Sequence, residues 1–176
     1  MTGDLLMAIA QELIAQGWFK QVQIDRNFTT DNPPQNVLPA VVVNMLDDIS
    51  SIFVGGLERR EYQIGLTVCF LDTNVDLKYS SQQIISNLKE SYNIVDNVQT
   101  LFNVQKFKTK AMQSLQSECN LITRSRGYNK RHTPYDKWSK NVIMFELVIR
   151  AIVTVPQEQP TVPVETITYD YQITVK

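Results

Sequence analysis

Residues 141–155 read NVIMFELVIRAIVTV, and this stretch decides the fold class. Apolar residues recur at every second position, which is the period of a β-strand with one buried face. They are Ile143, Phe145, Leu147, Ile149, Ala151, Val153 and Val155. Residues 61–71 repeat the pattern, with apolar side chains at each even position from Tyr62 to Phe70. We therefore expect a mainly antiparallel, twisted β-sheet with one packed face.

Shorter segments extend the expected sheet. Val22 and Ile24 suggest a short strand, and the nearly continuous apolar run 38–46 predicts a strand covered on both faces. The pair at 55–56 is Gly-Gly, which tolerates the positive φ angles of a tight turn, so we expect a hairpin around it. The apolar residues within 115–122 predict one more strand.

Two amphipathic helices are expected to pack on this sheet. The first has apolar residues at helical spacing within residues 5–14 and ends at Gly17. The second begins at Ser80, which forms a capping-box pattern with Gln83, and continues through residues 84–95. Residues 97–114 fit either a further short helix or a loop. The fold class is therefore α+β.

The C-terminal part has a different character. Residues 1–155 form the expected α+β domain, and residues 156–176 form a linker and a strand-like arm. The linker contains Pro156, Pro160 and Pro163, which make it stiff and extended. The arm has apolar residues at alternate positions, namely Ile167, Tyr169, Tyr171, Ile173 and Val175. Such a strand can fold back on its own sheet or add to the sheet edge of a neighbouring copy.

The charge of the chain is unevenly distributed. The net charge of −1 argues against a nucleic-acid binder that uses its whole surface. Nine of the 17 Lys and Arg residues, but only two acids, lie between Val104 and Lys140, so this stretch carries +7 and the rest −8. The stretch fits a solvated basic loop, but one positive and one negative region also suit head-to-tail contact between copies.

Residues 124–140 are expected to form a long polar loop within this basic stretch. Tyr128, Tyr135 and Trp138 lie among its basic residues, as in loops that stack on nucleic-acid bases. The same aromatic residues also fit a loop that is anchored on the protein body, because long ordered loops pack their own side chains.

The sequence offers little for catalysis or metal binding. His132 is the only histidine, and Cys69 and Cys119 lie 50 positions apart, so neither a multi-histidine nor a thiolate zinc site is expected. Phosphate-binding glycine motifs and the GxSxG elbow are absent. No segment has the length and composition of a transmembrane helix. We expect no enzyme activity and no cofactor, and we rank a catalytic role for His132 last.

The order of these segments resembles a known family. An initial helix is followed by LPAVVVN (38–44), a hairpin, REYQIGLTVCFLD (60–72), a helix, a strand, and YDKWSKNVIMFELVIRAIV (135–153). This resembles the tail terminator, or tail completion, proteins of long-tailed bacteriophages, whose fold is similar to that of phage neck and tail-tube proteins. The resemblance covers residues 1–155 and consists of the architecture, without a single diagnostic motif.

The resemblance implies a virion protein that is assembled in the bacterial cytoplasm as a hexameric ring on the last ring of the tail tube. The implied partners are other copies of the chain, the tail-tube protein, the neck or connector protein and, in contractile tails, the sheath. The lumen of such a ring passes DNA. The family has no catalytic residues to transfer, and another connector, neck or tube protein of the same fold is the first alternative.

A nucleic-acid-binding module that uses the basic residues is the alternative from a different class. The candidate interface residues combine these basic side chains with the apolar side of the arm. They are Arg124, Arg126, Lys130, Arg131, Ile167, Tyr169, Tyr171, Ile173 and Val175.

Overall fold

The computed structural model describes residues 1–24, 37–54, 57–73, 78–133 and 142–156. These residues form three α-helices and a five-stranded sheet, so the fold is α+β. The elements, in chain order, are α1 (Thr2–Gln16), β1 (Gln21–Ile24), β2 (Ala40–Val54), β3 (Leu57–Leu71), α2 (Ser81–Val104), α3 (Lys110–Glu118), β4 (Ile122–Thr133) and β5 (Val142–Pro156).

The sheet has the strand order β1-β2-β3-β5-β4. Only the β1–β2 pair is parallel, and the other three pairs are antiparallel. The two stretches with the clearest alternation, β3 and β5, are neighbours along their whole length, from Leu57 opposite Pro156 to Leu71 opposite Val142. Because β3 and β5 are central, their alternating apolar residues form the middle of the core.

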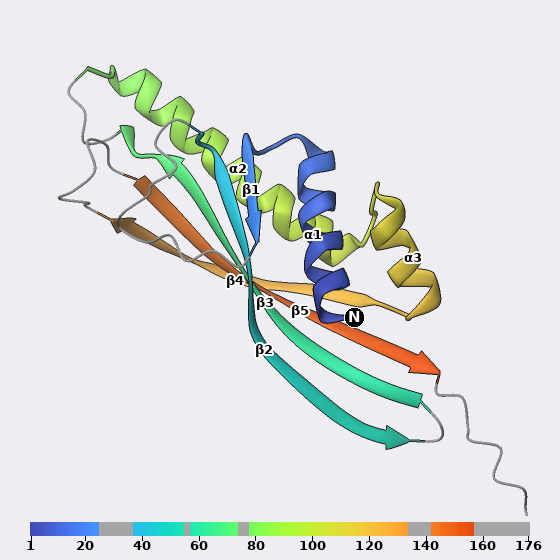
Figure 1. Cartoon of the computed structure of the whole chain (residues 1–176). Helices are drawn as coiled ribbons and strands as arrows, with labels where there is room; N and C mark the ends of the chain where they lie inside the picture. Colours follow the sequence, from blue (N-terminus) through green and yellow to red (C-terminus); the bar gives the residue numbers. More distant parts are fainter. Residues whose placement is uncertain (25–36, 55–56, 74–77, 134–141, 157–176) are drawn as a thin grey trace, which may run out of the picture.

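One face of the twisted sheet carries all three described helices (Figure 1). The even-numbered residues of β3 from Tyr62 to Phe70 and the odd-numbered residues of β5 from Ile143 to Val153 point to this face and are buried, as the alternation predicts. They pack against the apolar sides of the helices, including Leu5 and Ile9 of α1, Phe102 of α2 and Met112 of α3. A smaller cluster, built around Cys69 and Val142 with Leu38 and Met144, lies on the opposite face.

The expected helix boundaries are largely confirmed. Gly17 ends α1 in the left-handed conformation with φ 74°, and Ser80 and Gln83 form the complete capping box at the start of α2. The expected hairpin is also confirmed, since β2 and β3 pair antiparallel up to Val54 opposite Leu57. Helix α2 extends to Val104, beyond the expected 84–95.

The prediction of a strand within residues 115–122 is wrong for most of these residues. Residues 110–118 form α3, which begins after the cap residue Thr109, and the strand begins only at Ile122. Met112 of α3 is fully buried and Leu115 packs against the core. A helix of nine residues presents too few apolar positions to establish a helical period in the sequence.

Helices α1 and α3 are joined by a buried carboxylate. Glu12 is 0% exposed, and it accepts hydrogen bonds from the Lys108 N–H (2.9 Å), the Thr109 N–H (2.8 Å) and the Thr109 hydroxyl (2.8 Å). Gln16 donates a further one at 2.6 Å. Burial alone would raise the pKa of Glu12, but the hydrogen bonds from Lys108 and Thr109 outweigh it and hold the pKa below its ordinary value.

Candidate assembly surface

The sheet face opposite the helices is the main candidate surface, and we call it the open face. It carries the odd-numbered residues of β3 and the even-numbered residues of β5. Several of these side chains remain partly exposed in the middle of the sheet, including Gln63, Thr67, Val148 and Ile152. No described helix covers this face (Figure 1). It therefore presents strands to solvent across the centre of the molecule.

Charged side chains gather on the half of this face nearest the β2–β3 turn. Arg150 of β5 forms a bidentate ion pair with the carboxylate of Glu61 on the neighbouring strand β3. Arg124 lies directly opposite Arg150 in the β4–β5 pairing. The hydrogen bonds from Arg150 hold the pKa of Glu61 below its ordinary value, and the charges of Arg59 and Arg126 lower it further. Three arginines therefore act on the Glu61 carboxylate. Asp47 and Glu146 lie on the same face, opposite Gln63 and Thr67 of β3.

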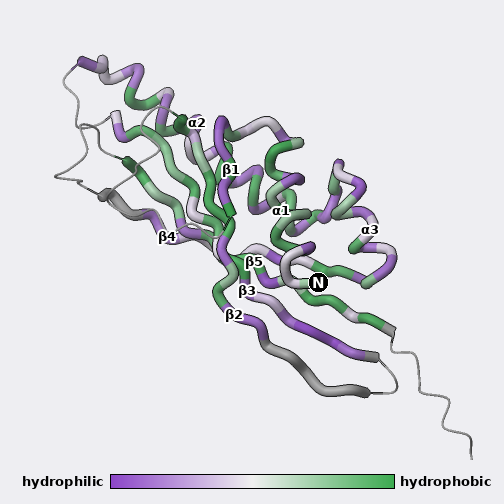
Figure 2. The backbone as a smooth tube through the Cα atoms, viewed as in Figure 1, coloured by the Kyte–Doolittle hydropathy of each residue, from purple (hydrophilic) through white to green (hydrophobic). Residues whose placement is uncertain are grey.

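In Figure 2, the half of β3 near the β2–β3 turn is hydrophilic, whereas the adjacent part of β5 is hydrophobic. The apolar side chains of the open face include Leu46, which is 56% exposed, and Ile122, which is 47% exposed. Leu46 lies over Gly65, where an added Cβ would come within 3.1 Å of the Leu46 side chain. The surface thus mixes exposed aliphatic groups with arginines, a composition found in protein interfaces.

The expected polar loop over residues 124–140 is wrong in its first part. Residues 122–133 form strand β4, so His132 lies in a strand and not in a loop. The register shifts between Ser125 and Tyr128, which breaks the alternation that identifies a strand. Among the described strands β4 also lies at an edge of the sheet, so fewer of its side chains need to be apolar.

The four basic residues that were predicted as an interface do not converge. Arg124 and Arg126 are exposed, and their charges belong to the open face. Lys130 lies opposite Phe145 and so points to the helix side, where its Nζ donates to the Tyr92 hydroxyl at 3.0 Å. Arg131 pairs with Met144 in the β4–β5 ladder. Strand alternation divides a group that is contiguous in the sequence.

Tyr128 belongs to the protein body. Its ring centroid lies 5.3 Å from that of Phe145 and 6.3 Å from that of Tyr92. Tyr92 and Phe145 are also 5.3 Å apart, so the three rings form one cluster beneath α2. For Tyr128, this supports the interpretation as an anchor over that of a base-stacking residue. Tyr135 and Trp138 lie outside the described residues, as do all five predicted arm residues from Ile167 to Val175.

The outer edge of β4 is bound by amide side chains between Thr123 and Arg126, a contact that the sequence did not reveal. Asn103 accepts a hydrogen bond from the Ser125 N–H at 2.8 Å, and Gln105 accepts one from the Thr123 N–H at 3.2 Å. Gln99 donates to the backbone carbonyl of Arg126 at 3.4 Å. The recurrence of amides at Gln99 and Asn103, one helical turn apart, is the only sequence signal for this contact.

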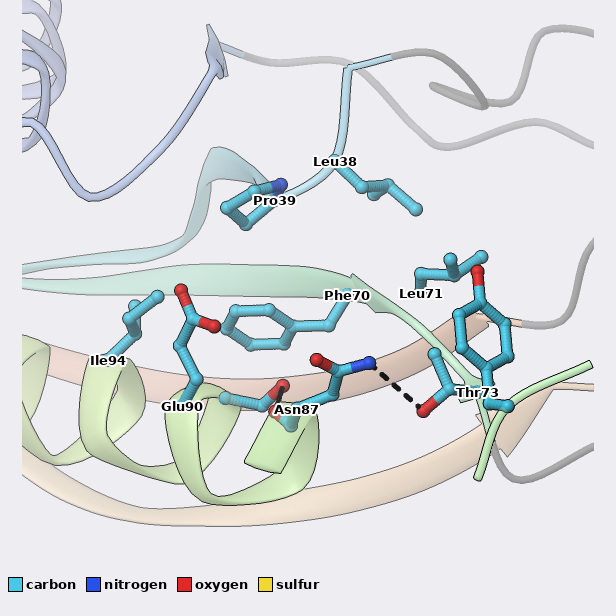
Figure 3. A pocket seen from close by; sticks show the side chains of 10 residues that line it. Leu38, Pro39, Phe70, Leu71, Thr73, Asn87, Glu90 and Ile94 are labelled. Atoms are coloured by element: carbon cyan, nitrogen blue, oxygen red, sulfur yellow. Dashed lines mark hydrogen bonds between the residues drawn. The ribbon is translucent and has the colours of Figure 1, made fainter. Parts of the chain in front are cut away.

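A pocket of about 220 Å³ opens at the other end of the sheet, between the first half of α2, the end of β3 and residues 38–39 (Figure 3). Its walls are mainly apolar, with Phe70 and Ile94 among them, and Asn87 donates to the Thr73 hydroxyl at 3.5 Å. The Ser91 hydroxyl donates to the Asn87 carbonyl at 2.9 Å, as Ser does within a helix. The side chains that line the pocket supply no paired nucleophile and base.

Within the described residues, no group of three His, Cys, Asp or Glu side chains is placed to hold a metal ion. None of the described helices combines the length and apolar character needed to cross a membrane. A comparison with protein-family models finds no match, and a search of curated proteins finds no significant relative.

Proposed function

We propose that this chain is a structural subunit that associates with copies of itself into a ring, in the role of a phage tail terminator. The open face carries the proposal, because it leaves exposed aliphatic and arginine side chains across the centre of the sheet. An antiparallel sheet can face water on one side, but exposed apolar side chains and unpaired strand edges also offer sites where a partner can bind. The resemblance of residues 1–155 to tail terminators supports the ring as the form of that assembly.

The charge distribution also supports contact between unlike surfaces of two copies. Arg59, Arg124, Arg126 and Arg150 lie on the open face. Asp48 is exposed on β2 beyond the part that β1 covers, and it points to the helix side because it lies opposite Tyr62, whereas Asp47, opposite Gln63, lies on the open face. Head-to-tail association through such surfaces forms a closed ring when the rotation between copies closes. The charges would orient the copies more than they would add affinity.

Light scattering across a concentration series tests self-association. Six copies of the 20.2 kDa chain would give about 121 kDa. We expect Leu46→Gln to reduce this mass while Ile14→Gln does not, because Leu46 lies on the open face and Ile14, 60% exposed, lies on α1. A monomer at every concentration, or equal effects of the two substitutions, would contradict association through the open face.

A second experiment tests the tail role. The chain is added to growing tubes of the tail-tube protein encoded in the same genome, and tube lengths are measured by electron microscopy. We expect the tubes to stop growing, and rings to be visible at tube ends. Tubes that grow equally long with and without the chain would exclude the terminator role, even if rings form in solution.

The arginines of the open face favour one second candidate, contact with nucleic acid. The open face carries Arg59, Arg124, Arg126 and Arg150 against the acidic residues Asp47, Glu61 and Glu146, and phosphate contacts make binding steeply salt dependent. If DNA is the ligand, Arg124→Ala with Arg126→Ala should weaken binding at low salt, and Lys130→Ala should change it little because Lys130 faces α2. Absence of salt-dependent DNA binding by the intact chain would exclude this candidate.

A further inference from the structure

The two edges of the sheet differ in a way that identifies where another strand can add. At β4, the outward backbone groups of Thr123, Ser125 and Arg126 are already bound by the side chains of Gln105, Asn103 and Gln99. An added strand would have to displace these amides from α2. This end of the β4 edge is therefore protected against strand addition.

The β2 edge lacks this protection over most of its length. β1 is four residues long and pairs only with residues 40–43 of β2. Beyond that point, residues 44–54 pair with β3 on one side, and no strand among the described residues lies on their other side. Residues 44–54 thus offer edge backbone groups to a partner strand, with register shifts between Met45 and Asp47 and between Ser51 and Val54.

The C-terminal segment leaves the sheet next to this edge. β5 ends at Pro156, which lies opposite Leu57, and Leu57 in turn lies opposite Val54 at the end of β2. The chain therefore leaves the body at the same end of the sheet as the free β2 edge. Residues 157–176 lie outside the described part, but their sequence contains a segment of matching length, the eleven residues 166–176 with apolar residues at alternate positions.

The linker is long enough to reach the edge of another copy. The nine residues 157–165 include Pro160 and Pro163, and a proline-rich linker extends by about 3.1 Å per residue, or about 28 Å in all. A strand added to the copy's own β2 edge would lie three strand spacings from β5, or about 14 Å. A linker of this length would reach the β2 edge of its own copy or of a neighbour, and the self-association proposed above favours the neighbour.

We propose that residues 166–176 of one copy add as a strand to the β2 edge, residues 44–54, of a second copy. The proposal rests on the self-association proposed above and identifies one of its contacts. Backbone hydrogen bonds would hold the added strand. Because its apolar residues alternate, the apolar side of the arm would lie on the same side as the apolar face of the sheet. A chain of such contacts, each from one copy to the next, fits a ring.

Photo-crosslinking of the full-length chain tests this. Benzoylphenylalanine replaces Tyr171, chains labelled with ¹⁵N are mixed with unlabelled chains before assembly, and crosslinked peptides are identified by mass spectrometry. We expect Tyr171 to crosslink to peptides from residues 44–54, with labelled and unlabelled chains joined to each other. The same photoreactive residue at Ile85, which is 65% exposed on α2, serves as the control and should not label the β2 edge.

Three results would overturn the proposal: crosslinks only within one chain, crosslinks to β4 or another element in place of the β2 edge, or no crosslink from position 171. A synthetic peptide of residues 164–176, added in excess to the intact assembly, should compete for the edge and lower the assembled mass, whereas a scrambled peptide should not. If the ring mass persists without crosslinks at the β2 edge, strand addition is wrong and the proposed function remains. If the full-length chain never assembles, the proposed function itself fails.

Discussion

Thr109 donates two hydrogen bonds to the buried carboxylate of Glu12, one from its backbone N–H and one from its hydroxyl, both 2.8 Å long. The same hydroxyl accepts the Met112 N–H at 3.4 Å and so caps α3. One carboxylate on α1 thereby fixes the start of a helix almost 100 residues later in the chain. The charge of Glu12 is expected to stabilise the docking of α1 against α3.

We expect Glu12→Gln to lower the free energy of unfolding at pH 7 by about 1–3 kcal/mol, because a buried acceptor of charge-assisted hydrogen bonds is lost. Since the pKa of Glu12 is lowered on folding, its contribution is complete above the unfolded value of about 4.3 and is lost as the pH falls through the folded value. Urea unfolding of both proteins at pH 7 and pH 3 measures this. The gap between them should shrink at pH 3.

Asp4→Asn is the matched control for this prediction. Asp4 lies on the same helix, its side chain is 77% exposed, and its described ion pair is with the amino terminus. An exposed pair of this kind contributes little to stability. If Asp4→Asn cost as much as Glu12→Gln at pH 7, the effect would come from the charge of α1 in general and not from the contact with Thr109.

Asn103→Ala should uncap the Ser125 N–H on the outer edge of β4. We expect faster hydrogen exchange at the Ser125 amide and a loss of stability of about 0.5–1 kcal/mol, the usual net value of one hydrogen bond. Exchange measured by NMR gives the local result. Asn97→Ala, at an exposed position of the same helix, should leave the Ser125 amide unchanged.

The aromatic cluster predicts different effects for two substitutions at Tyr128. Tyr128→Ala removes a ring packed against Phe145 and Tyr92 and should cost about 2–3 kcal/mol. Tyr128→Phe keeps the ring and should cost much less. Thermal or urea unfolding measures both. Comparable losses would show that the hydroxyl, rather than the packing of the ring, carries the contribution.

The two cysteines should differ in reactivity. Burial raises the pKa of the Cys69 thiol to about 12, so very little thiolate forms at pH 8. Cys119 is partly exposed at the end of α3. Iodoacetamide at pH 8, followed by mass spectrometry, should modify Cys119 first and reach Cys69 only after unfolding. Equal rates in the folded protein would contradict the burial of Cys69.

How far the sequence predicts the fold depends on where each element lies in the sheet. β3 and β5 occupy the middle, bury one full face and therefore carry an unbroken period of two. β4 lies at an edge, is interrupted at its register shift, and has exposed polar residues such as Arg124 and Asn129, so its sequence resembles a loop. A clear period of two appears only in strands that pair on both sides and bury one face.

The candidate surface was predicted less well, for a related reason. Arg124 and Lys130 are close in the sequence, but they face opposite sides of the sheet. The position of Glu12 does indicate a buried contact, because Glu12 lies on the same side of α1 as the apolar residues Leu5 and Ile9. A carboxylate that is buried there needs hydrogen-bond donors. The donors themselves, on Lys108 and Thr109, are backbone groups of another element and leave no pattern in the sequence.

The position of β5 between β3 and β4 has a consequence for synthesis of the chain. β5 is the last described strand in the sequence, yet it supplies the inner partner of both neighbours. Until the ribosome has made Pro156, β3 and β4 lack the strand that lies between them in the folded sheet. The sheet therefore closes late and over long sequence distances, which slows folding and exposes such chains to aggregation. Fragments that end before residue 142 should accordingly be recovered as aggregates, and a gene truncated there would be a poor source of soluble protein.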